Sequence, residues 1–133
     1  MSDNKGTTLF GWAVTASAGF LAAMGTALLF AGQEVGDALF RRPDVEPLAS
    51  LLGGALLGFS AMNWMVRRSV LGGIYGRAVL VGNHWHFVVG AIVLLKHGIE
   101  AGGSAGFFVL TGVYVLGASL FSYLLFRPGV GNQ

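Results

Sequence analysis

Two histidines and two asparagines stand inside otherwise apolar stretches, where their side chains could do chemistry. The segment Gly82-Asn83-His84-Trp85-His86 holds three of them, and Asn63 is the fourth. Imidazole nitrogens bind metals, transfer protons and form hydrogen bonds. Because residues two positions apart are turned by ~200° around a helix, His84 and His86 cannot hold one metal ion from the same helix. No metal site is expected.

A ring-shaped ligand is the alternative chemistry for this segment. One imidazole could serve as the axial ligand of a haem or chlorin, or contact a quinone, with Trp85 beside it. A bis-histidine site would need a second inward histidine, and His97 falls just beyond the end of its apolar stretch. The default interpretation is that both histidines are neutral and hydrogen-bonded. The candidate cofactor-binding residues are therefore His86, His84 and Trp85, with haem, chlorin or quinone as the possible ligands and no cofactor certain.

The asparagines and one tyrosine form a candidate polar cluster. Counted along a helix from the nearest arginine, Asn63 lies ~6 Å and Asn83 ~9 Å beyond the same boundary, so a hydrogen bond between them is expected. Such a bond would join two helices without any chemistry, and the alternative makes the pair the polar end of a ligand cavity. Tyr114 needs a partner and is expected to reach His86 if the third and fourth stretches are neighbours.

Four apolar stretches must position these residues. They cover residues 8–32, 48–66, 78–95 and 105–126, each near the ~20 residues that a helix needs to cross a bilayer. The chain is 54% hydrophobic and 11% charged, with a mean hydropathy of +0.69. The prediction is an all-α integral membrane protein, an antiparallel four-transmembrane-helix bundle that forms a single domain over residues 1–133.

The connecting segments predict the orientation of the bundle. One side collects five basic residues against the single acid Asp3, whereas the other side has three basic residues against five acids. The five basic residues are Lys5, Arg67, Arg68, Arg77 and Arg127. The positive-inside rule then places both termini in the cytoplasm. A net charge of +2, located beside apolar stretches, favours a lipid bilayer as partner and not nucleic acid.

Small residues are expected to line the helix contacts, because helices associate in lipid through close backbone approach. The candidate interface residues at four-residue or eight-residue spacing are Gly54, Gly58, Gly82 and Gly90. In the first outer connection, Val35, Ala38 and Leu39 recur at helical spacing, which predicts a short helix on the membrane surface. An ordinary polar connector is the equal alternative.

Part of the chain resembles a group of bacterial proteins. The run Leu-Leu-Gly-Gly-Ala-Leu-Leu-Gly-Phe from Leu51, the Asn-Trp pair at Asn63 and the run Arg-Ala-Val-Leu-Val-Gly-Asn that ends at Asn83 carry the resemblance. They are similar to small bacterial four-helix membrane proteins, loosely the DoxX group. The resemblance implies a bacterial inner membrane. DoxX-like proteins have been linked to quinone-connected oxidoreductase complexes, but no catalytic motif of such a complex is visible, so no catalytic residue is carried over.

Three functions remain after these observations. The leading interpretation is a non-catalytic membrane subunit that packs against other transmembrane proteins or against itself. The first alternative is a binding protein for a lipid-soluble ring, and the second is a small transporter or channel, which usually needs a polar path or repeated halves. Enzyme activity is not expected, because no Asp or Glu lies within the apolar stretches to orient the histidines.

Overall fold

Five helices follow one another along the part of the chain that the computed structural model describes, residues 3–41, 46–69 and 73–127. Four of them are long and apolar enough to cross a membrane, as the sequence predicts. The fifth is a short helix between the first two long ones. In chain order the helices are α1 (Asp3–Phe30), α2 (Gly32–Phe40), α3 (Glu46–Val66), α4 (Ile74–Ala101) and α5 (Ala105–Phe126).

The helix ends follow from local backbone chemistry. The Arg41 backbone, in the left-handed conformation with φ 56°, ends α2 and donates its N–H to the carbonyl of Asp37. Gly102 ends α4 at φ 69°, a conformation that glycine adopts without steric cost. The Ser104 hydroxyl caps α5 by accepting the N–H of Phe107 at 3.2 Å. The connection from α4 to α5 is therefore short and well defined.

The third apolar stretch forms a longer helix than the predicted range 78–95. Helix α4 runs from Ile74 to Ala101, because the charged residues after position 95 do not stop a helix. Lys96 and Glu100 lie four positions apart, with 3.9 Å between ammonium and carboxylate, a spacing compatible with a helix. Helix α2 confirms that the first outer connection contains a short helix, whereas its location on a membrane surface stays a prediction. Pro43, which cannot continue a helix, lies outside the described residues.

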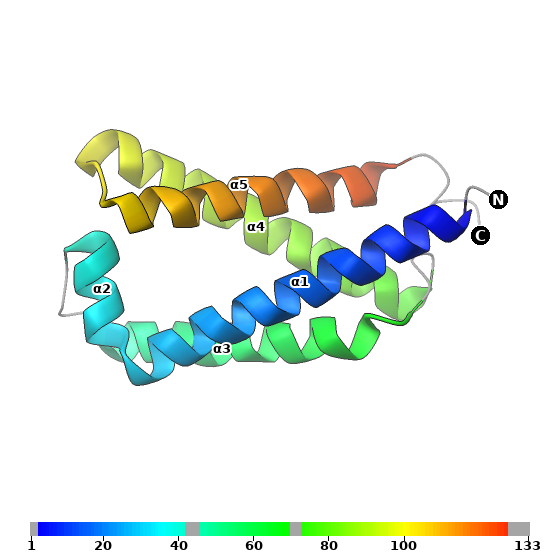
Figure 1. Ribbon diagram of the computed structural model, residues 1–133, viewed down its shortest axis with the longest axis horizontal. Helices are drawn as coiled ribbons and strands as arrows, with labels where there is room; N and C mark the ends of the chain where they lie inside the picture. The colour runs from blue at the N-terminus through cyan, green and yellow to red at the C-terminus, as the bar shows by residue number, and fades with distance from the viewer. Residues whose placement is uncertain (1–2, 42–45, 70–72, 128–133) are drawn as a thin grey trace.

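The bundle consists of two closely packed helix pairs (Figure 1). Helix α1 packs along α3, and α4 packs along α5, whereas contacts between the two pairs are sparser. Helix α2 lies at one end, where the hydroxyl of Ser104 donates to the carbonyl of Ala38 at 2.9 Å. At the other end α1 and α4 begin and α3 and α5 end (Figure 1), and we call it the arginine end after Arg67, Arg68, Arg77 and Arg127.

Glycines allow the close contact between α1 and α3. A Cβ at Gly53 would lie 2.7 Å from the carbonyl oxygen of Gly25, and one at Gly25 would lie 2.8 Å from that of Gly53. The two backbones thus touch where neither residue has a side chain. Gly54 and Gly58, expected to line a helix contact, do not do so within the bundle. Both lie on the outward face of α3, and a Cβ at either would meet nothing within 4 Å. Hydropathy is similar around α3, so spacing alone did not identify the packed face.

Replacement of Gly53 by alanine tests this contact. Because the added Cβ would press on the α1 backbone, we expect Gly53→Ala to lower the free energy of unfolding by about 1–3 kcal/mol. Gly54→Ala is the matched control, since its Cβ meets open space and alanine favours helix by up to ~1 kcal/mol. Unfolding of the purified protein by sodium dodecyl sulfate measures both. Equal stability of the two variants would contradict the Gly25 to Gly53 contact.

Candidate functional site

Asn63 on α3 and Asn83 on α4 form a reciprocal hydrogen-bonded pair. The Asn63 amide donates to Asn83 Oδ1 at 2.9 Å, and the Asn83 amide donates to Asn63 Oδ1 at 2.6 Å. The Asn83 amide also donates to the carbonyl of Val79 at 2.9 Å. Both side chains are fully buried. The hydrogen bond expected from their helical depths is therefore present, and it joins the two helix pairs.

His86 contacts the other helices through its ring and one nitrogen. Its Nε2 lies 3.2 Å from the Tyr114 hydroxyl, the partner expected from the sequence. Phe59 of α3 stacks on the imidazole, with 5.3 Å between ring centroids. Gly90 provides the space for the tyrosine, because a Cβ at Gly90 would overlap the Tyr114 ring. His86 thus contacts both α3 and α5 and is partly buried.

His84 forms a second polar contact between α4 and α5. Its Nδ1 lies 3.1 Å from the hydroxyl oxygen of Ser122, and that hydroxyl donates its proton to the carbonyl of Ala118 at 2.6 Å. The serine has only one proton, so the Nδ1–H of His84 is inferred to be the donor to the serine oxygen. Trp85, between the two histidines, is 61% exposed and points away from the bundle.

Aromatic rings connect the two helix pairs beside His86. Phe20 of α1 contacts Phe87 and Tyr114, with ring centroids 6.4 and 6.0 Å apart. Phe87 stacks on Phe121 of α5 at 5.4 Å. The contacts of Phe20 cross from α1 to α4 and α5, where close backbone contacts are few. The side chains, not the backbones, hold α1 against α4 and α5.

The chemistry open to this cluster is limited by its neighbours. Over residues 3–41, 46–69 and 73–127, no three side chains of His, Asp or Glu are grouped as metal ligands. The acidic residues of the long helices lie at or near their ends, as Glu46 and Glu100 do. A histidine acting as general base is usually oriented by a nearby acceptor such as a carboxylate. Here His84 and His86 are bonded to hydroxyl groups instead.

A ring-shaped ligand coordinated by Nε2 of His86 would have to displace the Tyr114 hydroxyl, which lies 3.2 Å from that nitrogen. A crevice between α1 and α5 lies close by, lined by Phe20, Phe87 and Phe121 and not by either histidine. Its volume of about 200 Å³ is below the roughly 300–1,000 Å³ of most ligand sites. Binding of haem, chlorin or quinone at His84, Trp85 and His86 stays a prediction.

Sequence reasoning missed the stacking of Phe59 on His86 and the pairing of Ser122 with His84. Phenylalanine and serine are common in apolar helices, so neither residue stands out before the helix rotations are known. A second feature that it missed is a groove at the arginine end. Trp64 and Arg67 signalled it by their spacing, because residues three apart on a helix are neighbours.

Geometry and composition together define the class: an all-helical protein with four candidate membrane spans. Comparison of the chain with protein-family models, with curated proteins and with solved structures finds no match. The likeness to the DoxX group therefore stays a prediction.

A double-mutant cycle tests the asparagine pair. We expect Asn63→Leu and Asn83→Leu each to lower the free energy of unfolding by about 1–2 kcal/mol, because each leaves one buried amide without its partner. The double variant should cost little more than either single variant, with a coupling energy of about 0.6–1.7 kcal/mol.

Ser119→Ala is the control for the cycle, since Ser119 is exposed and bonds only to the carbonyl of Val115 in its own helix. It should leave the free energy of unfolding almost unchanged. Additive costs for the two leucine variants would show that the asparagines do not interact.

Proposed function

We propose that the protein is a non-catalytic membrane subunit that packs against another transmembrane helix through the outward face of α3. We define this outer face by six exposed residues that share one side of the helix: Leu51, Gly54, Ala55, Gly58, Met62 and Met65. Gly54 and Gly58 are four residues apart, the spacing that lets two membrane helices approach closely. The open space around both glycines supports the proposal, because a second helix backbone fits there.

The polar residues of the spans support the same function indirectly. Asn63, Asn83, His84, His86 and Tyr114 all have partners inside the chain. No buried side-chain nitrogen or oxygen among the described residues lacks a hydrogen bond. A transporter or enzyme would instead keep polar groups free for a substrate. The outer face of α3, by contrast, is exposed and packs against no other helix among the described residues.

For localisation, we propose the inner membrane of a bacterium, with both termini in the cytoplasm. The arginine end then lies at the cytoplasmic leaflet, in agreement with the charge difference between the two sides of the bundle. Exposed Trp12, Trp64 and Tyr123 lie near the same end, where amphipathic rings settle at the depth of lipid headgroups. In this membrane, the partners of the protein would be other transmembrane subunits or a second copy of the chain.

Photo-cross-linking in native membranes tests the outer face. A photoreactive residue in place of Leu51, which is 74% exposed on this face, should form protein adducts with its partner. Gly58→Leu should reduce these adducts about tenfold, because the leucine side chain would hold the partner helix away. Gly112→Leu is the matched control: Gly112 also meets open space, but Phe108 and Leu116 stand at the neighbouring positions.

A second photoreactive position, Val109 on α5, is similarly exposed at 68% and lies outside the proposed face. It should give few protein adducts. The proposal fails if Leu51 yields only lipid adducts, or if Gly58→Leu and Gly112→Leu reduce the adducts equally.

A further inference from the structure

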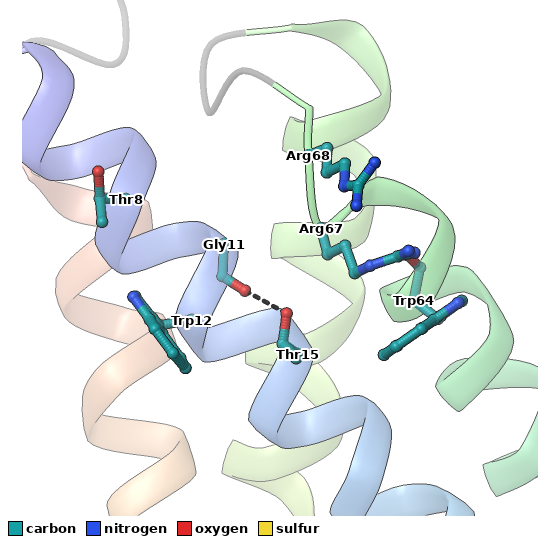
Figure 2. A pocket seen from close by; sticks show the side chains of 7 residues that line it. All are labelled: Thr8, Gly11, Trp12, Thr15, Trp64, Arg67 and Arg68. Atoms are coloured by element: carbon teal, nitrogen blue, oxygen red, sulfur yellow. Dashed lines mark hydrogen bonds between the residues drawn. The ribbon is translucent and has the colours of Figure 1, made fainter.

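A groove opens at the arginine end, between residues 8–15 of α1 and the C-terminal end of α3 with the two residues that follow it. Its volume is about 550 Å³. Figure 2 shows Trp12 on α1 and Trp64 on α3, with Gly11 and Thr15 between them and both arginines on the α3 side. The lining residues are Thr8, Gly11, Trp12, Thr15, Trp64, Arg67 and Arg68.

Gly11 lies at the bottom of the groove. A Cβ at this position would lie 2.9 Å from the carbonyl oxygen of Arg67, so only glycine lets the chain after α3 come so close to α1. The Thr15 hydroxyl donates to the carbonyl of Gly11 at 2.6 Å and is thereby satisfied by its own helix (Figure 2). Because the two backbones approach closely at Gly11, the larger lining side chains form the sides of the groove.

Arg67 is held in place by Trp64. Its guanidinium lies 3.8 Å from the centre of the indole ring and donates to the Trp64 carbonyl. Stacking on an aromatic ring fixes the plane of the guanidinium and leaves its remaining N–H donors for an anion. Arg68 follows directly and is exposed. Figure 2 shows both arginines on the α3 side of the groove, and Arg67 is pre-oriented by its contacts with Trp64.

The charge and the position of the groove indicate which class of ligand it is suited to bind. None of its seven lining residues is acidic, and two are arginines. Arginine matches phosphate oxygens with paired N–H donors. The exposed rings of Trp12 and Trp64 mark headgroup depth, because the candidate spans begin at Thr8 on α1 and end at Val66 on α3. An anion bound at this depth would lie at the membrane surface.

We propose that this groove binds the phosphate headgroup of an anionic phospholipid. Arg67 and Arg68 contact the phosphate, and the two tryptophans pack against the glycerol and the upper part of the acyl chains. Basic pockets between transmembrane helices on the cytoplasmic side are suited to such headgroups. The site shares the proposed cytoplasmic orientation but uses no residue of the outer face of α3, so it stands or fails independently of the proposed helix packing.

Native mass spectrometry of the full chain in mild detergent tests the proposal with phosphatidylglycerol and phosphatidylcholine as probes. We expect phosphatidylglycerol to bind more tightly, and Arg67→Gln/Arg68→Gln to raise its dissociation constant about tenfold, the loss of a charge-assisted contact. The matched control is Arg77→Gln/Arg127→Gln, which removes two charges at the same end from residues that do not line the groove. This control should keep the preference.

Two further variants keep the test valid if the double substitution disturbs folding. Arg68→Gln and Trp12→Leu change exposed side chains, and each should weaken phosphatidylglycerol binding while the circular dichroism stays that of the parent. The proposal is overturned if both lipids bind equally, or if the groove and control variants lose binding alike. It is also overturned if glycerol phosphate alone competes as well as the lipid, which would identify a site for soluble phosphates.

Discussion

The reciprocal hydrogen bonds between Asn63 and Asn83 fix how the two helix pairs fit together. In hydrocarbon an amide finds no water, so two buried asparagines on different helices satisfy each other or remain unsatisfied at a cost of several kcal/mol. The backbones of α3 and α4 come close at few places, and this pair holds them in one relative position. That position places Phe59 of α3 on the His86 ring of α4.

The sequence predicted those features that depend on distance along a helix. The depth of Asn63 and Asn83 follows from the rise per residue and the flanking arginines, and α5 has the predicted bounds 105–126. Features that depend on helix rotation were mostly missed, although the contact between His86 and Tyr114 was expected. Gly53 faces α1 and Gly54 faces outward, although both are glycines in an apolar helix, because hydropathy does not differ between the two faces. The stacking of Phe59 was missed for the same reason, whereas the extension of α4 to Ala101 was missed because the charged residues after position 95 do not stop a helix.

Because the polar side chains of the interior are hydrogen-bonded within the chain, we look for the function on the surface of the bundle. The polar side chains that looked reactive in the sequence are hydrogen-bonded across α4 and its neighbours. Two surface features remain without a use inside the fold: the glycine-containing outer face of α3 and the groove with Arg67 stacked on Trp64. Helix packing in lipid and headgroup binding are compatible roles, since they use different residues of α3.

Solid-state nuclear magnetic resonance of the protein in lipid bilayers, labelled only at asparagine, tests the central interaction most directly. Asn4 and Asn132, the other asparagines, lie near the chain ends, so the side-chain amides of Asn63 and Asn83 are readily separated from them. The account predicts through-space correlations between each amide nitrogen and the other residue's carbonyl carbon, with slow exchange against deuterated water. Absence of these correlations together with rapid exchange at both amides would contradict it.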